Sequence, residues 1–478
     1  MVPGGPRGAA ASGASKGTDL DGRRAALYLP AITFTTPPGI HVDEQLASCP
    51  AALGHPPPEG TPHMRPGKTS RLVTLATALA GVTAALCMAP ASATSAGHAA
   101  HRAAATPAVA ASPAAFTHPG VNLDTAQLDF IRAKVQAGAE PWKSAYDQMM
   151  ASKYADLNRT PKPRANVECG SYSHPNNGCT DERQDAIAAY TDALAWYINR
   201  DDRYAQKSIE LMDAWSATIQ EHTDSNAPLQ TGWAGASWPK AAEIIKHVYG
   251  NWPDEGRFDT MLRDVYLPTV IKGSNSNGNW ELTMMEAAVS ISVYLDDKAD
   301  YDTAISKYLT RTAAYVYLPS DGSLPKTVPS QHLDTRAKIV AYWQGQSTFN
   351  ASMTGVTQET CRDFTHTGYG ISNIGHVYET ARIQGQDLYP QVGERLRQAL
   401  GFQSRLETGA MSQPSTLCPG KSLKLGLGPI TEVGFNALHT RKGIAMTSTQ
   451  ALTERQRPAG TNSLFVAWET LTNAENPN

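Results

Sequence analysis

Residues 181–198 read DERQDAIAAYTDALAWYI, and this stretch decides the fold class. Thr180 is the expected N-cap, and Asp181 and Glu182 lie at the end of a helix that favours negative charge. The apolar side chains recur at helical spacing and form one stripe, made of Ile187, Tyr190, Leu194 and Tyr197. The stretch therefore predicts an amphipathic helix.

The same kind of stripe recurs along the rest of the chain, and alternating strand patterns are scarce. A series of amphipathic helices with short connections forms a bundle, a solenoid or a ring of helical hairpins. No repeat of fixed period is recognisable, which weakens the regular solenoid. The chain is predicted to be all-α, with helices over residues 204–219, 239–249, 281–295, 300–317, 367–384, 390–402 and 462–471 and Gly- and Pro-rich loops over 403–457.

The composition is that of a folded globular protein, with 478 residues of which 41% are hydrophobic and 18% charged. Such a chain can form two domains or one large one. Its formal net charge of -3 argues against a nucleic-acid-binding protein, because that binding depends on neutralising phosphates. An anionic substrate would need a local basic cleft.

A secretory signal peptide is predicted over residues 64–93. A basic stretch begins at Met64, an apolar run over residues 72–88 follows, and the small residues Ala91 and Ala93 mark a cleavage site. The alternative is a membrane anchor, but the run ends at a cleavable motif rather than at a basic stop-transfer segment. The mature protein is expected to be secreted and free of the membrane.

The segments on either side of the signal peptide carry no helical stripe. Residues 1–63 are rich in Gly, Pro and Ala, and we expect an over-extended gene start or a disordered leader. Residues 94–117 are rich in Ala, Pro and Ser and are expected to be a linker. The folded domain is predicted to occupy residues 118–478.

Four cysteines remain once the signal peptide is removed. An even number in an oxidising compartment predicts two disulfides, which would join Cys169 to Cys179 and Cys361 to Cys418. A zinc site is the alternative, but there is no CxxC pair and His174 is the only histidine nearby. No metal site and no cofactor are expected.

The segment CRDFTHTGYG, residues 361–370, is the richest in reactive side chains. If a helix begins there, Arg362, His366 and Tyr369 lie at i, i+4 and i+7 and share one face. Cleavage of a uronate polymer by elimination needs these residue types. Arg neutralises the carboxylate, His or Tyr removes the C5 proton, and Tyr protonates the leaving oxygen. The alternative is a surface helix with a half-buried Tyr.

A second polar segment, SNSNGNW, covers residues 274–280. Asn279 either caps the following helix or turns its amide toward a substrate carboxylate. Trp280 is a candidate stacking platform for a sugar ring, and Asn277 is a candidate sugar contact.

A third segment, LQTGWAG, covers residues 229–235 and precedes a predicted helix. Its glycines permit an unusual backbone path, and Gln230 and Trp233 are candidate sugar contacts. A buried structural Trp is the alternative.

These residues resemble the alginate lyase family of helical-toroid polysaccharide lyases, and the resemblance covers most of the mature chain. In that family an Asn, usually followed by His, begins a helix, and later an Arg precedes a Tyr by seven residues. Asn279 with Trp280 resembles the first element, and Arg362 with Tyr369 has the second spacing. Residues 378–389, YETARIQGQDLY, are similar to the family's helix after the catalytic Tyr.

The resemblance implies an incomplete (α/α) toroid of helical hairpins with long loops, and cleavage of alginate or a related polyuronate to unsaturated oligosaccharides. It implies that Tyr369 is the general base and acid and that Asn279 and Arg362 bind the carboxylate. Trp280 stands where the family has His, so His366 is expected to take that role. This departure leaves mannuronan, guluronan and glucuronan open as substrates.

Two other functions remain open. A glycoside hydrolase on a similar toroid needs two carboxylates that flank the bond, and none of Glu243, Glu286 and Asp363 forms a recognisable pair. A non-catalytic carbohydrate-binding protein would use Trp233, Trp238 and Trp280 as platforms. In each case a monomer that binds a polysaccharide, and no nucleic acid, is expected.

Overall fold

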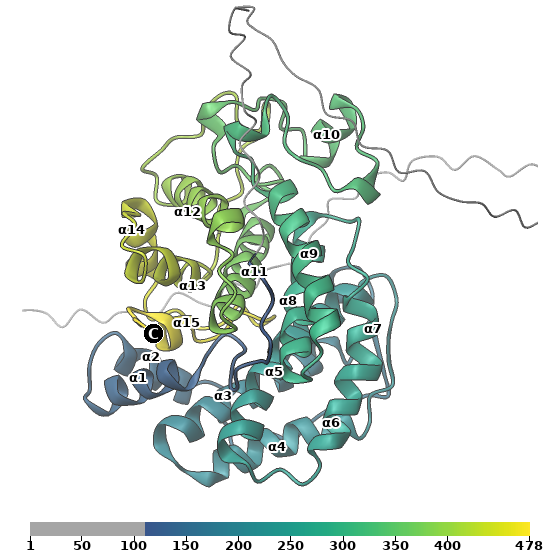
Figure 1. The fold of residues 1–478 in the computed structure, drawn as a ribbon, viewed down its shortest axis with the longest axis vertical. Helices are drawn as coiled ribbons and strands as arrows, with labels where there is room; N and C mark the ends of the chain where they lie inside the picture. Colours follow the sequence, from purple (N-terminus) through teal and green to yellow (C-terminus); the bar gives the residue numbers. More distant parts are fainter. Residues whose placement is uncertain (1–109) are drawn as a thin grey trace, which may run out of the picture. The chain divides into compact units, whose positions relative to one another are not determined.

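The computed structural model describes residues 110–478, which form a mostly helical unit with one small sheet (Figure 1). The predicted leader, signal peptide and most of the predicted linker lie outside the described residues.

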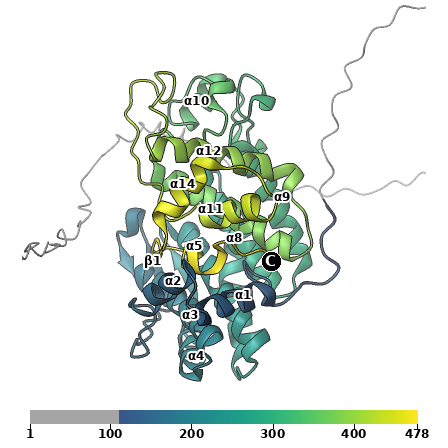
Figure 2. The same ribbon diagram turned by 90° about the vertical axis from the view of Figure 1, so that its left-hand side faces the viewer.

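Four long helices form an inner row. They are α3 (Cys179–Asn199), α5 (Ala227–Ile244), α8 (Gly278–Tyr294) and α11 (Phe364–Ile383), and each packs against the next in this order. Nearly every residue of α5 and α8 is buried, as expected for helices covered on all sides. Figures 1 and 2 label the four helices from two directions.

Outer helices cover this row, and each buries only one face. α4 (Asp202–Ser216) packs on α3, α9 (Lys298–Tyr315) packs on α8, and α12 (Glu394–Glu407) packs on α11. On α4 the buried side chains include Leu211 and Trp215, one turn apart. The alternation of inner and outer helices confirms the predicted all-α, (α/α) toroid architecture.

The remaining elements are short. The helices are α1 (Thr125–Gln136), α2 (Trp142–Met150), α6 (Glu255–Met261), α7 (Leu267–Val270), α10 (Arg336–Tyr342), α13 (Glu432–Phe435), α14 (Thr447–Gln456) and α15 (Glu469–Asn473). Single turns of 3-10 or π-helix are η1 (Ser171–Ser173), η2 (Ile245–Tyr249), η3 (Leu262–Tyr266), η4 (Pro319–Asp321), η5 (Pro329–Gln331), η6 (Ala351–Met353), η7 (Tyr389–Gly393) and η8 (Asn436–Thr440).

The sheet has the order β2-β1-β3, with strands β1 (Asn166–Cys169), β2 (Asn176–Asn177) and β3 (Glu221–Thr223). β1 is antiparallel to β2, where Glu168 faces Asn177, and parallel to β3, where Asn166 faces Glu221. The sheet connects the start of α3 to the segment before α5.

Several predicted boundaries are wrong. The N-cap of α3 is Gly178 rather than Thr180. The last helix covers Glu469–Asn473 instead of 462–471, because Asn462 Oδ1 accepts from the backbone N–H groups of residues 464–466 and holds a turn there. Residues 403–457, expected to be loops, also contain the end of α12 together with α13, η8 and α14.

Residues 229–235, expected to precede a helix, are part of α5, which begins at Ala227. Its glycines serve close packing rather than an unusual backbone path. A Cβ on Gly232 would lie 3.0 Å from Thr283 Cγ2, and one on Gly235 would lie 3.2 Å from Ala287 Cβ. Small residues at these positions therefore let α5 and α8 pack tightly.

Both predicted disulfides are present, Cys169 to Cys179 and Cys361 to Cys418. The first closes the loop that enters α3, and the second ties the segment before α11 to the loop after α12. Among the described residues, no helix has the length and apolar character needed to span a membrane.

Candidate active site

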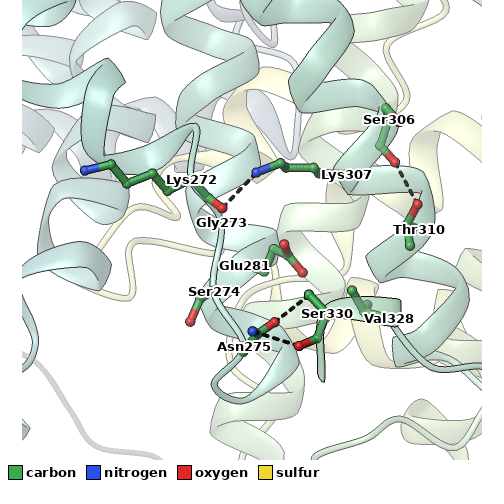
Figure 3. Close-up of a pocket in the computed structure, with 10 residues that line it drawn as sticks. All are labelled: Lys272, Gly273, Ser274, Asn275, Glu281, Ser306, Lys307, Thr310, Val328 and Ser330. Atoms are coloured by element: carbon green, nitrogen blue, oxygen red, sulfur yellow. Dashed lines mark hydrogen bonds between the residues drawn. The ribbon is translucent and has the colours of Figure 1, made fainter. Parts of the chain in front are cut away.

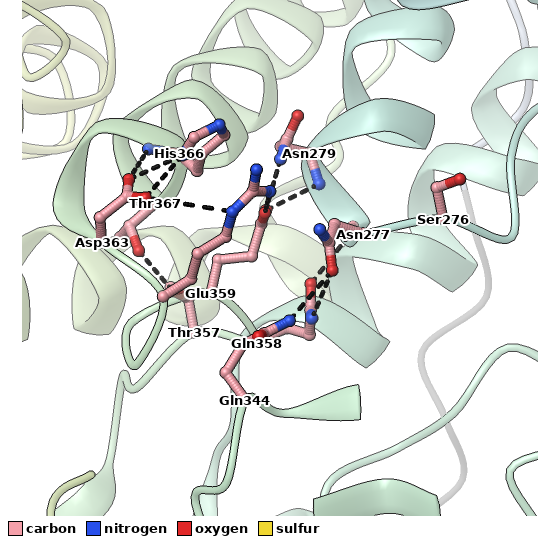
Figure 4. Close-up of polar contacts among 12 residues, drawn as sticks. Ser276, Asn277, Asn279, Gln344, Thr357, Gln358, Glu359, Asp363, His366 and Thr367 are labelled. Atoms are coloured by element: carbon pink, nitrogen blue, oxygen red, sulfur yellow. Dashed lines mark hydrogen bonds and ion pairs between the residues drawn. The ribbon is translucent and has the colours of Figure 1, made fainter. Parts of the chain in front are cut away.

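The first turn of α8 and the segment that leads into α11 meet at Glu359 (Figure 4). Asn279, in the first turn of α8, donates its backbone N–H to Glu359 Oε2 at 3.1 Å. The Asn279 amide donates to the two Glu359 oxygens at 2.6 and 2.8 Å. Both residues are fully buried, so this contact fixes the segment of residues 359–363 against α8.

Glu359 also holds the guanidinium that sequence reasoning singled out. Arg362 Nη1 donates to Glu359 Oε1 at 2.9 Å, and the Tyr315 hydroxyl donates to Glu359 Oε2 at 3.2 Å. The Arg362 side chain remains 23% exposed, which leaves part of its guanidinium open to a ligand. Sequence reasoning missed Glu359, although it lies three residues before Arg362 in the same cluster.

Arg362 is not on the expected helical face. α11 begins at Phe364 with Asp363 as its N-cap, so Arg362 lies in the segment that precedes the helix. Its contact with Glu359, rather than a helical spacing to His366, positions it.

Asp363 orients His366 as well as capping α11. Its Oδ1 accepts the backbone N–H of His366 at 2.8 Å, and the His366 ring Nδ1 lies 2.7 Å from the same oxygen. A carboxylate can only accept, so Nδ1 carries the proton and the neutral ring has its lone pair on Nε2. Burial raises the pKa of Asp363, but the hydrogen bonds and charges of His366 and Arg362 outweigh burial and hold the pKa below its usual value.

Tyr369 lies one turn beyond His366 on α11. The two rings meet edge to face with centroids 5.6 Å apart, and the Tyr369 ring also contacts Phe465. The Tyr369 hydroxyl makes no hydrogen bond to any described residue. Burial and the charge of Asp363 raise the pKa of Tyr369 to about 12, while Arg183 and Arg362 oppose this rise.

Arg183 of α3 is a second cation whose charge acts on the Tyr369 hydroxyl. Its guanidinium lies over the Trp233 ring, 5.3 Å from the centroid, and its Nη1 donates to Gln230 Oε1 at 2.7 Å. Sequence reasoning missed Arg183, although it precedes Ile187 by four residues and so continues the apolar stripe of α3. A charged residue at a position that continues a buried apolar stripe is unusual, and this could have marked Arg183 as a candidate functional residue.

Gln230 does not offer a free amide to a sugar, contrary to expectation. It is fully buried, and its amide group donates to Cys179 O at 3.1 Å and to Glu182 Oε2 while its oxygen accepts from Arg183. Gln230 therefore supports Arg183. Trp233 is buried beneath the Arg183 guanidinium and is 8% exposed.

Asn277 is the N-cap residue of α8, and Trp280 follows in the first turn. Asn277 Oδ1 accepts from the amides of Gln344 at 3.2 Å and Gln358 at 3.3 Å, as Figure 4 shows. The Trp280 ring is half-buried against the core. Trp238, another proposed platform, is fully buried and donates its ring N–H to the Tyr266 hydroxyl at 3.1 Å.

A separate pocket of about 340 Å³ lies beside α7 and α9 (Figure 3). Its Lys307 ammonium donates to the carbonyls of Ile271 and Lys272, each at 2.8 Å, and Glu281 pairs with Arg311. None of the sequence-predicted site residues lines this pocket.

Comparison with known proteins shows the family to which the chain belongs. The model of the alginate lyase family matches residues 131–405. No curated protein matches the chain significantly. Alginate lyase A1-III from Sphingomonas species A1 has a similar structure, with a TM-score of 0.50 and 14% identity over 75% of this chain and 97% of that one.

A histidine-to-alanine variant of that lyase, complexed with a tetrasaccharide, has a TM-score of 0.51 at 15% identity, over 75% of this chain and 96% of that one. These likenesses show the fold, whereas the family match covers more than half of the chain. The chain therefore belongs to the alginate lyase family and is a polysaccharide lyase with an anionic polysaccharide as its substrate.

Proposed function

We propose that this protein cleaves a uronic-acid polymer, alginate or a related polyuronate, by β-elimination at the cluster around Tyr369. The observation that carries the proposal is the convergence of an oriented imidazole, a phenol and two guanidinium groups. These belong to His366, Tyr369, Arg362 and Arg183. This set supplies the charge neutralisation, base and acid that elimination requires.

The two arginines neutralise the substrate carboxylate in this proposal. Removal of the uronate C5 proton moves negative charge onto that carboxylate, and cations stabilise it best in a site shielded from water. The Arg362 guanidinium is partly exposed, and its hydrogen bond to Glu359 fixes its position. Arg183 is buried, and its charge opposes the rise that burial causes in the pKa of Tyr369.

Proton transfer is divided between two side chains. His366 Nε2 takes the C5 proton, the electron pair forms the C4–C5 double bond, and the bond from C4 to the glycosidic oxygen breaks. Tyr369 gives its proton to that leaving oxygen. A pKa of about 12 keeps the Tyr369 phenol protonated near neutral pH, which favours the acid role. The family resemblance had given Tyr369 both roles.

Asn279 acts as a positioning residue in this proposal rather than as a direct ligand of the carboxylate. Its amide donates to both oxygens of Glu359, and no part of the residue is exposed. Through Glu359 it fixes the position of Arg362.

The carboxylates that a hydrolase would need are engaged elsewhere. Glu243 contacts His118 and the Gly120 backbone, and Glu286 contacts Lys240 and His376. Asp363 is bound to His366. These contacts favour the lyase over the hydrolase, and the reactive cluster favours an enzyme over a binding protein.

We also propose that the protein is exported through the signal peptide of residues 64–93 and acts as a secreted monomer. The pairing of all four cysteines of the mature chain supports an oxidising compartment.

The test is ultraviolet absorbance from the unsaturated product, with the wild type and Tyr369→Phe incubated separately on mannuronan, guluronan and glucuronan. We expect a rise on at least one polymer for the wild type. Tyr369→Phe should bind that polymer with unchanged affinity and turn it over roughly 10²–10⁴-fold more slowly. Equal turnover by the two proteins would remove Tyr369 from the mechanism.

A further inference from the structure

Three metal-binding side chains converge at the far end of α5. Glu243 lies in the last turn of α5, His247 follows one turn later in η2, and His118 comes from the segment before α1. One ligand atom from each lies within 4.8 Å of the other two. No metal site was predicted from the sequence. Only zinc ligation by the cysteines was considered there, and His118 is separated from Glu243 by 125 positions.

The distances between these donor atoms suit one small cation. His118 Nδ1 lies 3.0 Å from Glu243 Oε1, and His247 Nε2 lies 3.8 Å from the same oxygen. Ligands of a tetrahedral zinc ion, each at about 2.0–2.2 Å from the metal, are roughly 3.3–3.6 Å apart. The two observed separations fall on either side of that value, so small side-chain rotations would close the site.

Other groups already orient two of the three ligands. The Gly120 backbone N–H donates to Glu243 Oε2 at 2.7 Å. His118 Nδ1 lies 3.0 Å from Oε1 and 3.1 Å from Oε2, and His247 Nε2 lies 3.8 Å from Oε1, so Oε1 is the oxygen near both imidazoles. Asp296 lies in the turn after α8, and its Oδ1 is 3.3 Å from His118 Nε2. A carboxylate on the outer nitrogen of a metal-binding histidine, and a hydrogen bond to a ligating carboxylate, are typical supports of metal sites.

The charges in the cluster also require a cation. His118 has a carboxylate against each ring nitrogen, Glu243 on one side and Asp296 on the other, and carboxylates only accept. Either His118 is doubly protonated or a metal ion lies between Nδ1 and Glu243. The nearby Lys246 ammonium is engaged by Glu255 and Asp259.

His247 is free to serve as a ligand. Its ring stacks on that of His118, with centroids 4.2 Å apart, and it makes no hydrogen bond to a described residue. Glu243, by contrast, is 1% exposed, and a buried carboxylate needs a compensating charge.

We propose that His118, Glu243 and His247 bind one divalent transition-metal ion of the zinc class, with Asp296 and the Gly120 N–H as outer supports. Two imidazoles and one carboxylate are a ligand set that suits zinc. Glu243 lies ten residues beyond Trp233, or roughly 15 Å along α5, so the site is separate from the catalytic cluster. Its role is structural, because the ion joins the segment before α1 to the ends of α5 and α8.

Isothermal titration of the full chain with zinc chloride, after removal of bound metals by a chelator, tests the proposal. The variants are His247→Phe, which keeps a stacking ring but removes the ligand atom, and Asp296→Asn. His332→Phe alters an exposed histidine outside the cluster and is the matched control. Thermal unfolding with and without zinc is the second readout.

We expect the wild type and His332→Phe to bind one zinc ion at this site and to unfold at a higher temperature when it is bound. His247→Phe should lose that binding event and the thermal shift, and Asp296→Asn should weaken binding by roughly 10- to 100-fold. No zinc binding by the wild type, or the same affinity and stoichiometry in His247→Phe, would overturn the proposal and leave a protonated His118 as the cation.

Discussion

The ring Nδ1 of His366 lies 2.7 Å from Oδ1 of Asp363, and the same oxygen caps the helix that carries His366. One carboxylate therefore fixes where α11 begins, how the imidazole is rotated and which of its nitrogens carries the proton. In the proposed mechanism this contact leaves Nε2 as the base.

The variant Asp363→Asn tests the helix-capping role of this side chain separately from its role in orienting His366. Asn is about as good an N-cap as Asp, so α11 and the free energy of unfolding should change little. The amide has one acceptor oxygen and one NH2 donor group, so it can present an N–H instead of the second oxygen to Nδ1, and the proton-bearing nitrogen is no longer fixed. We expect the rate of product formation to fall roughly 10²–10⁴-fold, measured by ultraviolet absorbance beside a thermal unfolding control. Full activity in a correctly folded variant would contradict the role given to this pair.

Arg183→Gln removes the charge but keeps a polar side chain, so it should weaken the site more than it weakens the fold. With one of the two cations lost, the substrate carboxylate is less well neutralised, and we expect kcat/KM to fall by at least 10-fold. Arg203→Gln is the control, because Arg203 is an exposed residue of α4 whose guanidinium pairs with Asp201. Equal losses of kcat/KM in the two variants would contradict a role for Arg183 in neutralising the substrate carboxylate.

The buried network around His376 predicts a pH-dependent stability. Its ring nitrogens lie 2.8 Å from Glu286 Oε1 and 2.7 Å from Glu469 Oε1, and Lys240 pairs with Glu286. Burial lowers the pKa of His376, but these carboxylates outweigh burial and raise it. A raised folded-state pKa gives stability that is complete below the unfolded value of 6.5 and is lost as pH rises through the folded value.

His376→Gln should therefore destabilise the protein most near pH 6, by roughly 3–5 kcal/mol, because buried carboxylates lose their partner. The difference from the wild type should shrink toward pH 9, in urea unfolding at each pH. A pH-independent difference would contradict a charged His376. His332→Gln, at an exposed position, should show no difference at any pH.

The two disulfides should differ in what their loss does. Cys361 and Cys418 are 57 residues apart, against 10 for Cys169 and Cys179, so loop entropy alone predicts losses of about 4 and about 2.7 kcal/mol. The double replacement Cys361→Ser with Cys418→Ser should also reduce kcat, because Cys361 adjoins Arg362. Denaturant unfolding and steady-state rates measure the two effects. Stability losses in the reverse order would contradict the loop-entropy reasoning.

The all-α fold class could be predicted from local patterns of apolar residues in the sequence. The stripe of α3 and its repetition along the chain predict amphipathic helices, and most of the predicted ranges overlap real ones. The prediction from sequence was wrong where packing between helices outweighs the local preferences of the residues. Gly232 and Gly235 are typical of a loop in isolation, yet they lie in α5 because α8 approaches too closely for larger side chains.

The candidate site was predicted in part. Arg362, His366 and Tyr369 were singled out because they stand within one short segment. Asn279 was singled out in a second polar segment, and the family resemblance added to it. Glu359, which joins Asn279 to Arg362, could not be predicted, because its importance depends on contacts across 80 positions. The cluster of His118, Glu243 and His247 was missed for the same reason, since only the folded chain brings these residues together.

The most direct test of β-elimination at this site is the mass of the oligosaccharides released from the preferred polyuronate in water enriched in oxygen-18. Elimination adds no water, so we predict products that are lighter by one water than hydrolysis products and that carry no heavy oxygen. Products of full hydrolytic mass with heavy oxygen at the new end would contradict the account and indicate a glycoside hydrolase.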